Sequence, residues 1–170
     1  GEIFYNSTSF QLKSNIATAA FSSGGNLGTA RYTLAGGGTQ TAGLAFGGDI
    51  LPGPSALTEE YNGTGWAAGG NLNTARRSLF GCGTQTAGLA AGGNPNPSTT
   101  ANSEEYDGSS WTEGNNLGTA RRNMAAAGSQ TAAVAVGGQN PPGEVANVEE
   151  YRSEERRVGK ECRARGAPEH

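Results

Sequence analysis

Residues 26–48 read NLGTARYTLAGGGTQTAGLAFGG, and closely similar stretches occupy residues 71–93 and 116–138. Each stretch begins 45 residues after the one before it, with no insertion between copies. A fixed period of this length indicates a repeat architecture, in which each copy forms one structural unit that packs against its neighbours. The same step relates three Glu-Glu-Tyr triplets, which end at Tyr61, Tyr106 and Tyr151, and three aromatic residues, Phe21, Trp66 and Trp111.

Each repeat is expected to contain four short strands. The third strand centres on the Glu-Glu-Tyr triplet and the fourth on the tryptophan. Asn62-Gly63 and Asp107-Gly108 separate these two strands, and such dipeptides favour a hairpin. Four strands in a period near 45 residues indicate the blades of a β-propeller. The first strand is predicted at residues 32–38, 78–83 and 123–128, and the second at residues 41–48 with copies that begin at Thr86 and Thr131.

Small side chains mark the strand that we expect to lie nearest the propeller axis. The middle of the first strand reads AGGG, FGCG or AAAG in the three repeats. Because blades converge on the axis, this strand has room only for small residues. The tryptophans and tyrosines are expected to fill the wider gap between blades, where one aromatic side chain supplies much of the buried area. We therefore predict that Phe21, Trp66 and Trp111 are buried at equivalent positions between blades.

The order of these motifs resembles the kelch repeat, in which a glycine pair ends the second strand, a tyrosine lies in the third and a tryptophan in the fourth. The resemblance implies an all-β fold of four-stranded antiparallel kelch-type blades, about three of them, over residues 16–151. Propellers usually have four to eight blades, so we expect this chain to be a fragment of a larger propeller. The residues that match the family pattern are Gly47, Gly48, Tyr61, Trp66, Gly92, Gly93, Tyr106, Trp111, Gly137, Gly138 and Tyr151.

The two ends of the chain differ from the repeats. Residues 1–15 resemble β-hairpin segments that precede repeats in phage tail and fibre proteins, and the Gly- and Ala-rich repeats resemble those of phage structural proteins. This resemblance implies a location in a virion. Residues 152–162 read RSEERRVGKEC, which resembles the translation of a sequencing adapter. We expect residues 152–170 to be non-native and to lack packing against the blades.

Charge and hydropathy exclude two classes of partner. The whole chain has a formal net charge of −3, and residues 1–151 hold 11 acidic and 6 basic side chains. An acidic body without a basic stripe argues against nucleic acid. No apolar run approaches the roughly 18 residues that a membrane span needs, so we expect no such span.

The body of the chain lacks the residues from which most active sites are built. Residues 1–151 contain no histidine, and their only cysteine is Cys82. Neither a Ser/His/Asp or Cys/His arrangement nor a His/Cys metal site can form there. Cys82 is expected to be a small core residue. We predict that the chain is not an enzyme and that it binds no cofactor and no metal ion.

Adjacent glutamates begin the third strand of every repeat, at residues 59–60, 104–105 and 149–150. Adjacent residues of a strand point to opposite faces, so the two carboxylates of a pair diverge and cannot act together on one substrate. Arg31, Arg76 and Arg121 begin the first strand at the same end of the blade. We expect one arginine–carboxylate contact in each blade, with a ligand site as the alternative.

The loops between the second and third strands, residues 49–57, 94–102 and 139–147, are the parts of the repeat that vary freely. Polar loop tips on a repeated scaffold suit recognition, so we predict a non-catalytic structural or interaction module that binds a protein, a host-surface glycan or other virion proteins. Two alternatives stay open: a fragment of a propeller enzyme of the sugar oxidase or lyase type whose catalytic residues lie elsewhere, and a cellular kelch scaffold. The candidate binding face comprises Arg31, Asp49, Arg76, Asn94, Asn96, Arg121, Gln139 and Asn140.

Overall fold

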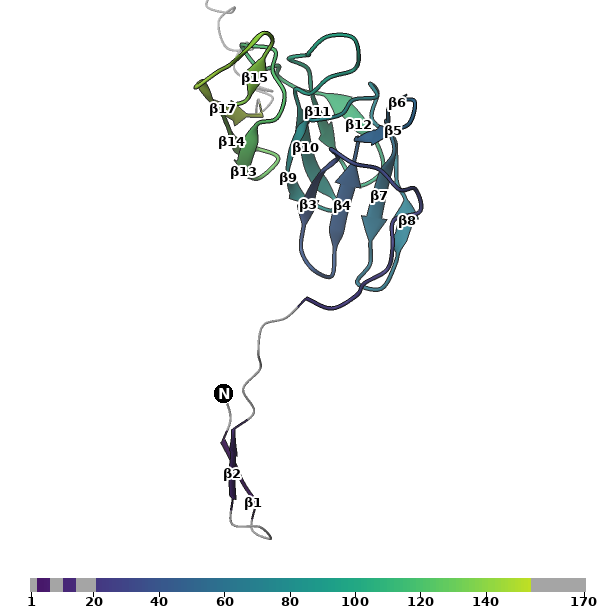
Figure 1. Cartoon of the computed structure of the whole chain (residues 1–170), viewed down its shortest axis with the longest axis vertical. Helices are drawn as coiled ribbons and strands as arrows, with labels where there is room; N and C mark the ends of the chain where they lie inside the picture. The colour runs from purple at the N-terminus through teal and green to yellow at the C-terminus, as the bar shows by residue number, and fades with distance from the viewer. Residues whose placement is uncertain (1–2, 7–10, 15–20, 154–170) are drawn as a thin grey trace, which may run out of the picture.

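A computed structural model describes residues 3–6, 11–14 and 21–153, which form 17 strands and no helix (Figure 1). The fold is therefore all-β, as predicted. Near the N-terminus, β1 (Ile3–Asn6) and β2 (Gln11–Ser14) pair in antiparallel fashion, as expected for a hairpin. The segment predicted to be non-native lies outside the described residues, except for Arg152 and Ser153. Arg152 pairs with Ala132, and the N–H of Ser153 donates to the carbonyl oxygen of Thr131 at 3.2 Å, so the predicted lack of packing is wrong for these two residues.

Three antiparallel sheets follow, one for each repeat, and we call them blades 1, 2 and 3. Each is a meander in which strands adjacent along the repeat pair with one another. The four-stranded repeat is confirmed in blades 1 and 2, whereas blade 3 has three strands among the described residues. Blade 1 contains β3 (Ala35–Gly38), β4 (Gly43–Phe46), β7 (Thr58–Tyr61) and β8 (Trp66–Ala68). Blade 2 contains β9 (Phe80–Thr84), β10 (Ala87–Ala91), β11 (Ser103–Tyr106) and β12 (Trp111–Glu113). Blade 3 contains β13 (Ala125–Gly128), β14 (Ala132–Val136) and β17 (Val148–Arg152).

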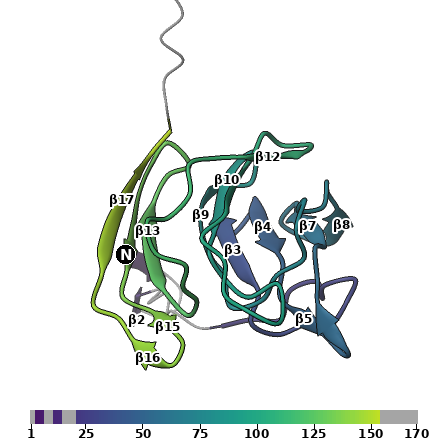
Figure 2. The same ribbon diagram turned by 90° about the horizontal axis from the view of Figure 1, so that it is seen from above.

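The blades lie side by side, with blade 2 between the other two (Figure 2). Their first strands face one another, β3 against β9 and β9 against β13. A Cβ atom added to Gly37 would lie 3.0 Å from the carbonyl oxygen of Gly83, and one on Gly81 would lie 3.0 Å from the Cβ atom of Ala35. Small residues are therefore required where these strands meet, which confirms the prediction for the innermost strand.

The first strand of each blade begins later than predicted. It starts at Ala35, Phe80 and Ala125 instead of at residues 32, 78 and 123. In each repeat one residue just before it has a positive φ, which interrupts an extended strand. These residues are Thr33, Ser78 and Asn123, with φ of 52°, 54° and 56°.

The hydrophobic core lies between the blades. One cluster joins Leu44 and Phe46 of blade 1 to Ala90, Tyr106 and Trp111 of blade 2. The second cluster joins blade 2 to blade 3 and contains Phe80, Cys82, Leu89, Ala91, Ala133 and Ala135. Cys82 is a buried core residue, as predicted, and burial raises the pKa of its thiol.

The three aromatic residues related by the repeat have different environments. Trp111 is buried, with its ring 4.8 Å from that of Phe46, and its Nε1 donates a hydrogen bond of 3.0 Å to Oγ1 of Thr58. Trp66 is half-buried, and Phe21 is fully exposed. The prediction of equivalent burial is therefore correct for Trp111 and wrong for Phe21. The physical reason is that the described residues include no blade before blade 1 to cover them.

Candidate functional site

The variable loops are anchored at their first residue. In blade 1 the loop folds into a small hairpin of β5 (Asp49–Ile50) and β6 (Gly53–Pro54), and in blade 3 into β15 (Gln139–Asn140) and β16 (Gly143–Glu144). The first loop residue also forms an antiparallel bridge with the turn that leads into the first strand of the same blade. The bridges join Tyr32 to Asp49, Arg77 to Asn94 and Arg122 to Gln139. The loops and the arginine-bearing turns therefore lie at the same end of each blade, as predicted.

Glycine pairs connect the loop bases of blades 1 and 2 to the following blade. Gly47 and Gly48 have φ of 66° and 100°, and the N–H of Gly48 donates to the carbonyl oxygen of Arg76 at 3.0 Å. A Cβ atom on Gly48 would lie 2.8 Å from the carbonyl oxygen of Tyr32. The N–H of Gly93 makes the equivalent bond of 2.9 Å to Arg121. The pair is required because the backbone is both left-handed and tightly approached.

An ion pair with a buried arginine side chain lies beneath each loop. Nη2 of Arg76 donates to Oε1 of Glu104 at 2.5 Å, and Nη1 donates to the carbonyl oxygen of Asn102, the last loop residue, at 2.7 Å. Oε2 of Glu104 accepts the N–H of Asn73 at 2.7 Å. Burial lowers the pKa of Arg76, and the charge of Glu104 opposes that shift. The equivalent pairs in blades 1 and 3 are Arg31 with Glu59 and Arg121 with Glu149. The predicted contact between arginine and carboxylate is thus present in every blade.

Burial corrects the predicted composition of the binding face. The side chains of the three arginines are 0% exposed, so they are internal ion-pair partners and are not available at the surface. A charge buried this deeply must be paired, and the pairing uses the groups that a ligand would need. Asp49 and Asn94 are also buried. Of the remaining candidates, Asn96 and Asn140 are exposed and Gln139 is half-buried.

The second arginine of repeats 2 and 3 has a role that the sequence analysis missed. Nη1 of Arg77 pairs with Oδ2 of Asp49 in the preceding blade, and the hydroxyl of Tyr32 donates to the same oxygen at 3.1 Å. The hydrogen bond to Asp49 raises the pKa of Arg77. In repeat 3, Nε of Arg122 donates to Oε1 of Gln139 at 3.1 Å. The Thr-Ala-Arg-Arg sequence, repeated at residues 74–77 and 119–122, was the available signal.

A repeated glutamine forms a second link between blades. Nε2 of Gln85 donates to the carbonyl oxygen of Tyr61 at 2.7 Å, and Nε2 of Gln130 donates to that of Tyr106 at 2.6 Å. Each glutamine belongs to the turn between the first two strands of its own blade and reaches the third strand of the blade before it. Its recurrence at 45 residues could have identified this link from the sequence.

The groups left at the surface of the loops are small and mostly neutral. The exposed tips carry Leu51, which is 88% exposed, together with Pro52, Asn96, Pro97 and Asn140. These side chains and their backbone groups can form hydrogen bonds and modest apolar contacts. Within residues 3–6, 11–14 and 21–153, no cluster of His, Cys, Asp and Glu is arranged to hold a metal ion. The same described residues contain no helix long and apolar enough to span a membrane.

No protein-family model matches the chain, and a search of curated proteins finds no significant match.

Proposed function

We propose that this chain is a non-catalytic interaction module of kelch-type blades, in which the three loop tips together bind a partner. The observation that carries the proposal is the contrast between the bases and the tips of the loops. The ion pairs and glycine pairs beneath the loops repeat from blade to blade and are buried or half-buried, whereas the exposed tip residues differ between loops. A fixed base with varied tips allows recognition to change without a change of fold.

The exposed chemistry favours a protein partner over a glycan. Leu51 and the prolines of the tips offer apolar contacts, and Asn96 and Asn140 offer amide donors and acceptors. Glycan recognition commonly uses an aromatic platform, and the three loops contain no Tyr, Trp or Phe. The resemblance to phage structural proteins supports a partner among virion or host-surface proteins.

Exchange of the tips alone tests the proposal. The variant replaces residues 50–53, 95–98 and 140–143 by Gly-Ser sequences and retains the anchoring residues Asp49, Asn94 and Gln139. A matched control carries Thr41→Ser and Thr86→Ser, at exposed positions in the turns at the opposite end of the blades. Binders are selected from a displayed protein library against the unmodified chain, and a glycan array is probed in parallel.

We expect selected binders to lose at least tenfold in affinity for the tip variant and to retain affinity for the control. Circular dichroism verifies that both variants keep the β fold. Equal binding to the unmodified chain and the tip variant would overturn the proposal, and binding confined to the glycan array would overturn the preference for a protein.

A further inference from the structure

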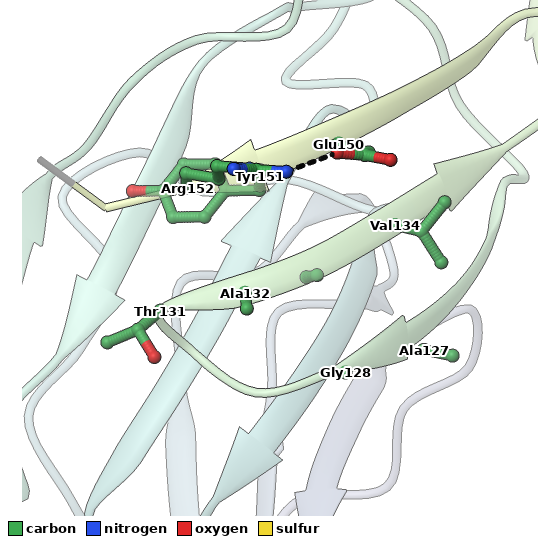
Figure 3. A pocket seen from close by; sticks show the side chains of 9 residues that line it. Ala127, Gly128, Thr131, Ala132, Val134, Glu150, Tyr151 and Arg152 are labelled. Atoms are coloured by element: carbon green, nitrogen blue, oxygen red, sulfur yellow. Dashed lines mark hydrogen bonds and ion pairs between the residues drawn. The ribbon is translucent and has the colours of Figure 1, made fainter.

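The outer face of blade 3 corresponds to a face that blades 1 and 2 bury. Leu44 and Phe46 of blade 1 are 2% and 0% exposed because blade 2 covers them. Their equivalents in blade 3 are Val134 and Val136, and Val136 is 43% exposed. Val148, equivalent to the buried Thr58, is 61% exposed. Figure 3 shows Val134 and Ala127 on this face, which borders an open depression of about 610 Å³. None of the described residues covers it.

A hydrogen-bond acceptor on the same face lacks the partner that its equivalents have. Glu60 of blade 1 accepts the hydroxyl of Tyr106 from blade 2, and Glu105 of blade 2 accepts that of Tyr151 from blade 3. Both bonds are 2.6 Å long. The equivalent Glu150 pairs instead with Arg152 of its own strand at 3.0 Å, with both side chains exposed (Figure 3). Glu150 is thus placed to accept a tyrosine hydroxyl from a further blade.

Blade 1 carries the complementary face. Tyr61 and Trp66 are equivalent to Tyr106 and Trp111, which pack on the preceding blade. The hydroxyl of Tyr61 donates to the carbonyl oxygen of Gly63 at 3.1 Å instead of to a glutamate of another blade. Gln40, equivalent to the glutamines that link blades, is exposed. One molecule therefore holds both halves of an interface that it already forms twice internally.

The segment before blade 1 matches a fourth strand, which blade 3 does not have among the residues that the structure describes. Phe21–Ser23 lies one period before β8, whose Trp66 pairs with Tyr61 and whose Ala67 pairs with Glu60. In the same register, Phe21 would lie opposite Tyr151 and Ser22 opposite Glu150. A small cavity beside Tyr151 is lined by Ala91 and Leu117, where the counterpart of Trp111 would stand. Phe21 is fully exposed in its own chain and is available to fill it.

We propose that a second copy of this chain covers the outer face of blade 3. Phe21–Ser23 of that copy adds the fourth strand to blade 3, and its blade 1 packs on the exposed valines. Such a head-to-tail contact produces a ring when the rotation closes. The six described blades of two such copies lie within the range of about four to eight at which propellers close. The inference is independent of what the loops bind.

Sedimentation equilibrium and variants of the full chain test the assembly. We expect a mass of twice 17.2 kDa. The double substitution Val136→Lys and Val148→Lys should convert it to a monomer with unchanged circular dichroism, because charges on this face cannot be buried. The matched control, Leu51→Lys, introduces the same charge at an exposed loop tip and should leave the dimer intact. A monomeric parent chain, a mass that keeps rising with concentration, or a dimer that survives the double substitution would overturn the proposal.

A disulfide pair tests the register directly. Ser22→Cys and Glu150→Cys are made in separate chains, each with Cys162→Ser to remove a competing thiol. Oxidation of the mixture should yield a covalent dimer containing one chain of each kind, and neither chain alone should yield it. Absence of this product in the mixture would overturn the proposed strand exchange. The same pair placed in one chain should cross-link between chains, and an exclusively intrachain disulfide would also overturn it.

Discussion

The hydroxyl of Tyr106 donates a 2.6 Å hydrogen bond to Oε1 of Glu60, a residue 46 positions earlier in the neighbouring blade. Glu59, adjacent to Glu60, points to the other face of the strand and pairs with Arg31. The two glutamates of one motif therefore make different contacts. The first pairs with an arginine beneath the loop of its own blade, and the second binds a tyrosine of the next blade. The divergence follows from strand geometry, in which successive side chains alternate between faces.

The tyrosines that join blades should ionise at a higher pH than an unperturbed tyrosine. Burial raises the pKa of Tyr106 to about 12, with the hydrogen bond to Glu60 adding to the shift, and Tyr151 is raised to about 12 in the same way beside Glu105. Since an unperturbed tyrosine has a pKa of about 10, spectrophotometric titration at high pH should resolve a late step. Tyr106→Phe should reduce the amplitude of that step, and ionisation of all tyrosines in one step near pH 10 would contradict the prediction.

The same shift determines how stability changes with pH. Because the folded state holds these protons above the pKa of the unfolded chain, stability falls as pH rises between about 10 and 12 and is fully present below about 10. Urea unfolding followed by circular dichroism over this range should show a midpoint that decreases with pH. Tyr106→Phe should make the decrease shallower, and an unchanged slope would contradict the assignment to Tyr106.

Loss of one partner of a buried ion pair should be strongly destabilising. Arg76→Met leaves Glu104 buried without its counter-charge, at a cost of about 3–5 kcal/mol in the free energy of unfolding. Arg122→Met is the matched control, since Arg122 is half-buried and its Nε contacts the neutral Gln139. It should cost clearly less when both are measured by urea unfolding.

A double variant separates two causes of the destabilisation by Arg76→Met: the unpaired charge left on Glu104 and the lost packing of the arginine side chain. Adding Glu104→Gln to Arg76→Met removes the unpaired charge and should restore part of the lost stability. If the double variant loses as much free energy of unfolding as the two single variants lose together, the coupling between Arg76 and Glu104 is negligible.

Much of this fold could be predicted from the sequence because the repeat expresses each structural requirement three times. Small residues in the first strand, the glycine pairs and the arginine–glutamate contacts all recur at one spacing. The observed starts of the first strands, which lie two or three residues later than predicted, could not be predicted in this way. Thr33, for example, is a good β-former, and nothing in its pattern indicates a φ of 52°.

The candidate face was harder to predict because burial depends on neighbouring repeats. Asp49 looks like an exposed loop residue within its own repeat, but Arg77 of the next repeat covers and pairs with it. Phe21 shows the converse, since its pattern predicts burial and the described residues provide no preceding blade. A pattern read within one repeat does not contain contacts made between repeats.

The glycine pairs should tolerate no side chain. Gly48→Ala combines a φ of 100° with a Cβ contact 2.8 Å from the carbonyl oxygen of Tyr32. The left-handed conformation alone costs roughly 1–2 kcal/mol, and the contact adds to it. Gly53→Ala is the control, because nothing lies within 4 Å of its added Cβ atom. Thermal melts should separate the two variants, and equal melting temperatures would contradict the requirement for glycine at the loop base.

The loss of stability caused by Trp66→Ala should depend on protein concentration, whereas the loss caused by Trp111→Ala should not. Trp111→Ala removes a ring buried between blades of one chain and should cost about 3–5 kcal/mol at every concentration. Trp66 is half-buried within its own chain, so Trp66→Ala should cost less in dilute solution. If a second copy covers Trp66, the cost of its removal should rise as the chain becomes dimeric, since association stabilises the folded state by mass action. Urea unfolding by circular dichroism at several concentrations measures this, and Val136→Lys with Val148→Lys provides the monomeric reference. Concentration-independent costs for both tryptophans in the parent chain would mean that Trp66 does not lie in an interface between copies.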